Sequence, residues 1–229
     1  DGPFIRIFEN TSSKCVKKFG AKLSVEYAAD QLIKYMGGMR NLFPSTKFIL
    51  LTNYPNWNSF GNASINTIGN RILDSSNRAL SYEDVFRVAV TRANEQGIPF
   101  ASLEIDHPYN FFIYGTGLKS SGLVTTSVTN ARWLKIQKLI SLAQSFNMPT
   151  NIIINAEVDE DSLRASDEFT YLTLQYVDDI KAYALNVAYS IQSWYAVPSA
   201  VLPEKQNASF TNVVLQVASK FGMASPVVN

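Results

Sequence analysis

Residues 97–109, GIPFASLEIDHPY, contain the pattern that decides the fold. A tight turn, Gly97 to Pro99, leads directly into an apolar strand, Phe100–Asp106, which ends where a long polar loop begins. Polar and apolar side chains alternate along this strand with the period of two that separates the faces of a sheet. One face is therefore expected to pack under helices, while the other carries Glu104 and Asp106 to the C-terminal end of the strand.

Strand and helix alternate along the rest of the chain. Apolar, β-rich segments predict further strands at Phe4–Glu9, Lys47–Asn53, Asn151–Glu157 and Ala188–Tyr195. Helical periodicity predicts helices at about Val25–Phe43, Tyr82–Gln96, Ala131–Phe146, Asp167–Leu185 and Phe210–Phe221. Ser81 and Ser166 stand where the N-caps of the second and fourth helices are expected. Strict alternation of this kind predicts a parallel sheet with helices on its outside.

The loops point to one end of the sheet. Connections from helix to strand are short, at residues 97–99 and 147–150, whereas those from strand to helix are long, at about residues 54–81 and 107–130. Long loops inside a compact domain are usually functional. Parallel α/β sheets bind their ligands at the C-terminal ends of the strands, in open sheets and in barrels alike. The functional site is therefore expected at that end.

The five predicted strand–helix units fit two architectures. An open, flavodoxin-like nucleotide-binding sheet would carry a phosphate loop, but neither G-x-G-x-x-G nor G-x-x-x-x-G-K-[ST] is present. We therefore predict an α/β fold of the (β/α)8 TIM-barrel type, with residues 1–229 forming a single catalytic-type domain. Because five units are too few to close a barrel, its N-terminal units are expected to be missing from this chain or supplied by a second polypeptide.

Composition excludes several classes of protein. The net charge is +1 and no basic run occurs, so nucleic acid is not an expected partner. No apolar run is long enough to cross a bilayer, so no membrane partner is expected either. With one cysteine, Cys15, and one histidine, His107, neither a disulfide framework nor a Cys- or His-rich metal centre is expected. No cofactor is predicted, and a Ser-His-Asp triad would lack its G-x-S-x-G elbow.

Three N-x-S/T sequons bear on location, at Asn10-Thr11-Ser12, Asn62-Ala63-Ser64 and Asn207-Ala208-Ser209. Together with loops rich in Asn, Ser, Thr and Tyr, they favour an extracellular, secreted glycoprotein. No signal peptide is visible, and the chain opens directly ahead of a predicted strand, so a processed or truncated N-terminus is expected.

Two strand ends carry the candidate catalytic groups. Glu104 and Asp106 share the polar face of one strand, and Asn155 and Glu157 share one face of the next. An Asn beside a carboxylate can hold a sugar hydroxyl while the acid transfers a proton. Structural interpretations stand beside these functional ones. The first two carboxylates can join an ion-pair layer with a residue such as Arg6, and Glu157 can open a solvated acidic loop that contains Asp159, Glu160 and Asp161.

Carboxylates from different strands of one barrel suit glycoside hydrolysis, in which one acts as acid and the other as nucleophile or base. Glu104 is the candidate acid and Glu157 the candidate nucleophile or base, in an assignment that can be reversed, and Asp106 assists them. The predicted reaction is the hydrolysis of a poly- or oligosaccharide.

Side chains near these strand ends suit a carbohydrate substrate. Trp57 follows the second strand and Trp194 ends the last, where indole faces can stack on sugar rings or simply cap the core. Gln192 lies on the same face as Trp194 and can donate to a substrate hydroxyl. His107 and Tyr109, in the loop after Asp106, are further candidates for substrate binding.

The last strand ends in Gln192-Ser193-Trp194-Tyr195 and is followed by Pro198, Pro203-Glu204 and a final helix. In this order of features the chain resembles the C-terminal part of TIM-barrel glycoside hydrolases. The resemblance implies that Trp194 supports the sugar at the cleavage point and that Glu157 is the nucleophile of the seventh strand. The acid/base of that family, usually Asn-Glu on the fourth strand, corresponds to a reversed Glu9-Asn10 here. In an alternative register, Glu104 takes the acid/base position.

Two functions of other kinds are left as alternatives. A carbohydrate-binding barrel without catalytic activity would keep the aromatic cleft and lack one carboxylate. A polysaccharide lyase would use Tyr109 or His107 as its base.

Overall fold

The structure is a computed structural model, and it describes residues 25–52, 80–114, 126–159, 162–183, 185–193, 197–201, 203 and 206–223. Several features singled out in the sequence lie outside these residues: the predicted strand Phe4–Glu9 with Arg6, the sequon asparagines Asn10 and Asn62, Cys15, Trp57, the loop acids Glu160 and Asp161, and Trp194.

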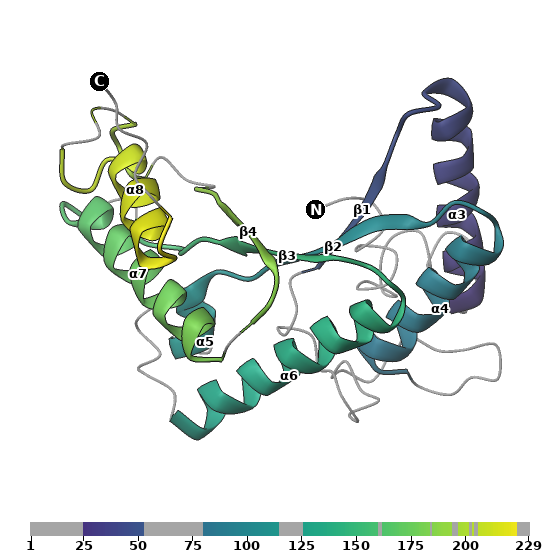
Figure 1. The fold of residues 1–229 in the computed structure, drawn as a ribbon, viewed down its shortest axis with the longest axis horizontal. Helices are drawn as coiled ribbons and strands as arrows, with labels where there is room; N and C mark the ends of the chain where they lie inside the picture. Colours follow the sequence, from purple (N-terminus) through teal and green to yellow (C-terminus); the bar gives the residue numbers. More distant parts are fainter. Residues whose placement is uncertain are drawn as a thin grey trace. The chain divides into compact units, whose positions relative to one another are not determined.

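The described residues form a mixed α/β structure with a four-stranded parallel sheet (Figure 1). The strands follow one another in chain order: β1 (Phe48–Thr52), β2 (Phe100–Asp106), β3 (Thr150–Ile154) and β4 (Ala188–Ile191). The helices are α3 (Val25–Leu42), α4 (Tyr82–Glu95), α5 (Tyr109–Tyr114), α6 (Thr126–Ser145), α7 (Ala165–Ala182) and α8 (Phe210–Lys220). The predicted alternation of parallel strands with helices is thus confirmed, and it is compatible with a partial β/α repeat fold.

The strand and helix bounds differ from the prediction where tertiary contacts intervene. The strand predicted at Asn151–Glu157 ends at Ile154, because the carbonyl of Asn155 accepts a hydrogen bond from the Tyr109 backbone N–H at 3.0 Å instead of continuing the ladder. The strand predicted at Ala188–Tyr195 ends at Ile191. α6 begins at Thr126 rather than Ala131, and α5 was not predicted at all.

One predicted helix cap is confirmed and the other is wrong. The Ser81 hydroxyl accepts the Asp84 backbone N–H at 3.3 Å, and the Asp84 carboxylate accepts the Ser81 backbone N–H at 3.1 Å, so α4 begins with a capping box. α7 begins at Ala165 with Arg164 in the N-cap position and no side-chain cap. Ser166 lies within its first turn, and its hydroxyl accepts the backbone N–H of Ser199 at 3.2 Å.

The short connections that were predicted after α4 and α6 share one motif. In each, a residue in the left-handed region follows the helix: Gly97 with a φ of 68° and Asn147 with a φ of 55°. After α4, Gly97 N–H donates to the Asn94 carbonyl at 3.0 Å, and Ile98 N–H donates to the Ala93 carbonyl at 2.9 Å. This pairing is the Schellman motif, which satisfies the last carbonyls of the helix and turns the chain toward the next strand.

The chain divides into two compact units, and each is described by itself. In the first (Asp1–Ile105 and Lys135–Thr150), α3 packs against α4. Their contact buries a small apolar cluster made of Val25, Ala28, Ala29, Leu80 and Val85. β1 pairs in parallel with β2, so that Leu51 lies opposite Glu104.

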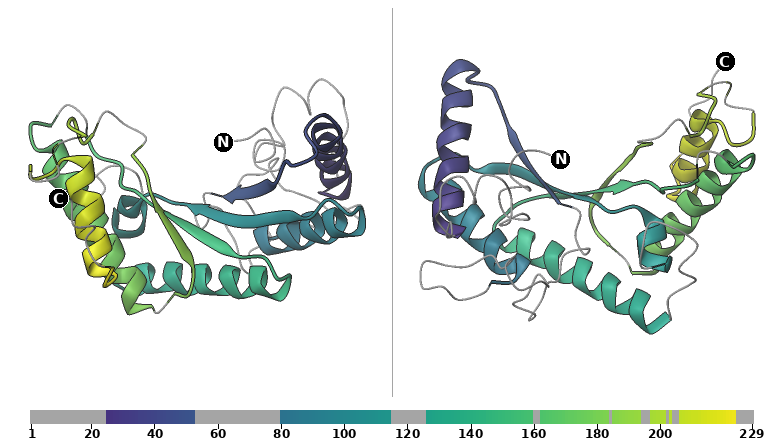
Figure 2. Two further views of the ribbon diagram at one scale, coloured as in Figure 1. Left: turned by 45° about the horizontal axis from the view of Figure 1, so that its top comes forward. Right: turned by 180° about the vertical axis from the view of Figure 1, so that it is seen from behind.

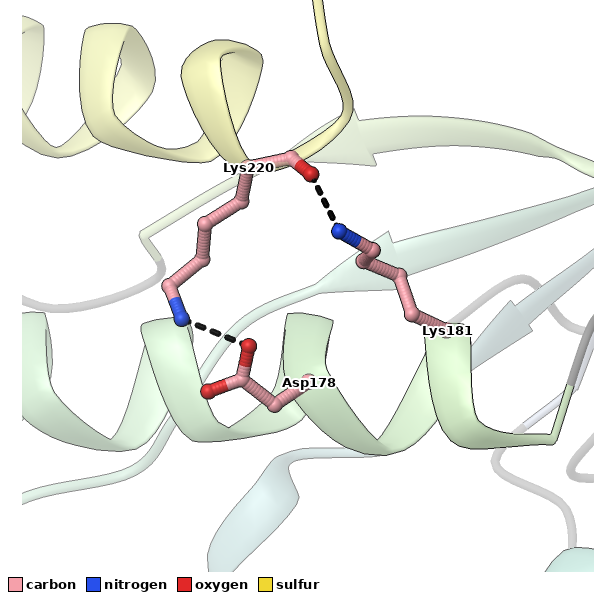
Figure 3. A network of polar contacts seen from close by, with 3 residues as sticks. All are labelled: Asp178, Lys181 and Lys220. Atoms are coloured by element: carbon pink, nitrogen blue, oxygen red, sulfur yellow. Dashed lines mark hydrogen bonds and ion pairs between the residues drawn. The ribbon is translucent and has the colours of Figure 1, made fainter.

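In the second unit (Asp106–Leu134 and Asn151–Asn229), α7 and α8 lie side by side in every view (Figures 1 and 2). Phe169 and Tyr176 of α7 and Val213 and Val217 of α8 are buried. Two lysines connect the helices at the surface (Figure 3): Lys220 Nζ lies 2.5 Å from Asp178 Oδ1, and Lys181 Nζ donates to the Lys220 carbonyl at 2.6 Å. The second contact gives a terminal carbonyl of α8 a cationic partner.

The conformation of Gly97 gives a prediction for stability. Gly97→Ala should lower the free energy of unfolding by about 1 kcal/mol, because a left-handed φ is unfavourable for any residue with a Cβ. An added Cβ meets no atom within 4 Å, so the cost is conformational rather than steric.

Gly38→Ala is the matched control. Gly38 lies inside α3 and its Cβ position is equally open, so alanine should raise the free energy of unfolding by about 0.5–1 kcal/mol. Urea unfolding followed by circular dichroism measures both changes. If both variants shift in the same direction, the conformational argument is wrong.

Candidate functional site

The candidate site of the second unit is built on a hydrogen bond between two strand ends. Asp106 is the last residue of β2 and Asn155 directly follows β3. Both side chains are buried, and Asn155 Nδ2 donates to Asp106 Oδ1 at 2.7 Å. A buried carboxylate is costly without hydrogen-bond donors, so this bond fixes where both side chains lie.

Two more hydrogen bonds join the same segments. The Tyr109 backbone N–H donates to the Asn155 carbonyl at 3.0 Å, and the Glu157 backbone N–H donates to Asn110 Oδ1 at 2.8 Å. Asn110 is buried at the start of α5, whereas the Glu157 side chain is only half-buried. The segment after β3 is therefore held against the start of α5, with the carboxylate of Glu157 at its edge.

Aromatic side chains surround a second carboxylate, that of Asp179 on α7. Tyr109 Oη donates to Asp179 Oδ2 at 2.9 Å, and Trp133 Nε1 donates to the same oxygen at 3.3 Å. The Tyr109 ring stacks on Tyr176 with a centroid distance of 5.2 Å, and Trp133 stacks on Tyr183 at 5.3 Å. We call Tyr109, Trp133, Tyr176, Asp179 and Tyr183 the aromatic cluster.

Burial raises the pKa of Asp179 and of Tyr109 in the aromatic cluster. Burial raises the pKa of Asp179, while the hydrogen bonds from Tyr109 and Trp133 act in the opposite direction. Burial and the nearby charge of Asp179 raise the pKa of Tyr109 well above its ordinary value. Tyr109 therefore stays protonated and keeps donating to Asp179 across the neutral range.

His107 is buried directly beside Asp106 in the chain. Burial, together with the positive charge of Arg132, lowers the pKa of His107 from 6.5 to about 3. The imidazole is therefore neutral near pH 7. Because neither His107 nor Tyr109 is solvent-exposed, both are better placed to support the strand ends than to accept a proton from a substrate.

The structure brings together some of the predicted site residues. Asp106, His107, Tyr109, Asn155 and Glu157 all belong to the second unit, where hydrogen bonds join Tyr109 and Asp106 to Asn155.

The other candidates lie elsewhere. Glu104 belongs to the first unit; its half-buried side chain alternates with fully buried Leu103 and Ile105, as the period of two predicts. Gln192 follows β4, half-buried, and its backbone N–H donates to the Ile154 carbonyl at 3.2 Å. Trp57, Trp194 and Arg6 are outside the described residues, and Asp159 is exposed.

Sequence reasoning missed Asn110, Tyr176 and Asp179. A signal for Asp179 was present: Tyr176, Asp179 and Tyr183 are spaced three and four residues apart, which places them on one face of a helix. A carboxylate that lies between two aromatic side chains is partly shielded from water, so it requires hydrogen-bond donors from the protein. Tyr109 and Trp133 supply them.

No protein-family model, no curated protein and no solved structure matches this chain. Within the described ranges, no group of His, Cys, Asp and Glu side chains could hold a metal ion. The helices described here also include none with the length and apolar character needed to span a membrane.

The contact between Tyr109 and Asp179 is testable. Tyr109→Phe removes a donor from a half-buried carboxylate, so the free energy of unfolding should fall by about 1–2 kcal/mol. Tyr35→Phe removes the same hydroxyl from an exposed position on α3 and should leave stability unchanged. Equal stability of the two variants in urea unfolding would contradict the role of the bond.

The neutral state of His107 predicts a pH dependence of stability. The unfolded chain takes up a proton near pH 6.5, whereas the folded protein does so only near pH 3. Stability should therefore fall as the pH falls from 7.5 to 5, with His107 contributing about 2 kcal/mol of the loss.

In urea unfolding, His107→Asn should remove the part of the pH dependence of stability that His107 contributes. NMR of the wild-type protein gives a second measurement. Since His107 is the one histidine, its imidazole proton resonance can be followed by NMR without assignment. It should not titrate between pH 7.5 and 5. A midpoint near 6.5 would contradict the buried neutral state.

Proposed function

We propose that this chain is a secreted, carbohydrate-active hydrolase that cleaves glycosidic bonds of a poly- or oligosaccharide. One observation carries the proposal: the carboxylates of Asp106, at the end of β2, and of Glu157, three residues after β3, belong to segments fixed by buried amide side chains. Glycosidases need two carboxyl groups held in a defined geometry, and fixed strand ends provide such positions.

The proposed roles follow from burial. Glu157 is half-buried on a fixed backbone, which suits a nucleophile, or a base toward water. On the sequence argument alone, Glu104, which is half-buried in the first unit, is proposed as the acid that protonates the leaving oxygen. Asp106 is 9% exposed and already accepts from Asn155, so it assists by positioning rather than by proton transfer.

The proposal includes a sugar-binding surface and a larger fold. Gln192 is proposed to donate to a sugar hydroxyl, and Trp57 and Trp194, on the sequence argument, to stack on the rings. His107, Tyr109 and Asn155 support the site from its buried side. The parallel strands are proposed to belong to a (β/α)8 barrel, completed by residues outside the described ranges or by a second polypeptide.

The test is a set of amide substitutions assayed on a panel of soluble polysaccharides. Glu157→Gln and Glu104→Gln should each lower the release of reducing ends by about 10²-fold or more while sugar binding is retained. Asp159→Asn is the matched control, since this exposed acid lies two residues after Glu157 and has no proposed role. Full activity of either glutamine variant would remove that residue from the mechanism.

Binding without cleavage is the second candidate, and the burial of Asp106 favours it. A carboxylate occupied by Asn155 and shielded from solvent can serve purely to fix a binding surface. The same panel separates the candidates: binding measured by calorimetry, with no reducing ends released by the wild-type protein, would establish the second. The lyase reading fits less well because its candidate bases, Tyr109 and His107, are buried.

A further inference from the structure

The sequon Asn207-Ala208-Ser209 lies in the turn that leads into α8. Asn207 is exposed, and Ala208 has a left-handed φ of 59°. Ser209 is fully buried. The acceptor residue of the sequon is therefore exposed to solvent, whereas the residue whose hydroxyl completes the sequon is buried.

The Ser209 hydroxyl has two structural partners. It accepts the Asn212 backbone N–H at 3.2 Å as the N-cap of α8, and it donates to the Pro203 carbonyl at 2.8 Å. In the folded protein this hydroxyl is not accessible to a glycosyltransferase. The amide of Asn207, two positions before the N-cap, remains exposed.

We propose that Asn207 carries an N-linked glycan, and that it is transferred before the N-terminus of α8 folds. The donor is a lipid pyrophosphate-linked oligosaccharide. A bond forms between Asn207 Nδ2 and C1 of the first sugar, the bond from C1 to the pyrophosphate oxygen breaks, and the amide nitrogen loses a proton. The lipid pyrophosphate leaves. The inference rests on the proposed extracellular location and not on the hydrolase activity.

The geometry explains how the folded protein accommodates the glycan. Because Asn207 is exposed, the sugar extends into solvent without displacing a side chain of the core. Before α8 folds, the Ser209 hydroxyl completes the sequon that the transferase recognises. After the glycan has been transferred, the same hydroxyl caps the N-terminus of α8. Asn10 and Asn62, the other sequon asparagines, lie outside the described residues.

The test directs the full 229-residue chain into the secretory pathway of a eukaryotic cell. Peptides are mapped by mass spectrometry after enzymatic deglycosylation in ¹⁸O water, which converts a glycosylated Asn into labelled Asp. Label is expected at Asn207 and should be lost in Asn207→Gln. Ser209→Thr keeps both the sequon and the cap, so it should keep the glycan.

Ser209→Asp separates the role of Ser209 in the sequon from its role as the N-cap of α8. Aspartate accepts the Asn212 N–H at the N-cap as serine does and breaks the sequon, but it cannot donate to the Pro203 carbonyl, so the variant should be less stable, still fold, and carry no glycan at position 207. Folded, unmodified wild-type protein given the transferase and its lipid-linked donor should stay unmodified. An unlabelled Asn207 in the secreted wild-type chain would overturn the site, and modification of the folded protein would overturn the order of events.

The outcome is independent of the hydrolase proposal. Glu157→Gln should carry the same glycan as the wild-type chain, whether or not either cleaves a polysaccharide. A glycan without cleavage therefore leaves this inference intact and counts against the hydrolase alone.

Discussion

The hydrogen bond from Asn155 to Asp106 is the contact on which the candidate site depends. At 2.7 Å and with both residues buried, it ties the last residue of β2 to the residue that follows β3. Without it, the buried carboxylate of Asp106 would lose a hydrogen-bond donor, which is unfavourable. The bond also sets the direction of Asn155, whose carbonyl then receives the Tyr109 N–H and positions α5. The position of Glu157, two residues further on, follows from the same anchor.

Secondary structure was predictable wherever the signal was local. The bounds of β2 and the capping box at Ser81 depend on residues adjacent in the chain, and the sequence contains that information. The end of β3 depends on Asn155 exchanging a ladder bond for contacts with Tyr109 and Asp106, which are distant in the chain. Ser166 shows the same limit, because its hydroxyl serves Ser199 rather than its own helix.

The sequence predicted where the candidate site lies in the fold, but it did not predict which residues contact one another there. The rule that ligands bind at strand ends, applied to the long loops, selected Asp106, Asn155 and Glu157, which lie in two segments that the structure joins by hydrogen bonds. Period-two patterning put Glu104 and Asp106 on one face but could not show that one is half-buried and the other buried. The buried partner of Asp106, Asn155, follows another strand and is 49 residues away in the chain.

Asn155, Tyr109 and Trp133 supply neutral hydrogen-bond donors to Asp106 and Asp179, and this has an electrostatic consequence. Asn155 donates to Asp106, and Tyr109 and Trp133 donate to Asp179, and a neutral donor of this kind stabilises a carboxylate without cancelling its charge. The charge of Asp106 still reaches Tyr176, whose pKa is raised mainly by burial and further by Asp106. Glycoside hydrolysis passes through a transition state with positive, oxocarbenium-like character. Under the proposed function, the charge that Asp106 retains would contribute negative potential of the kind that such a state requires.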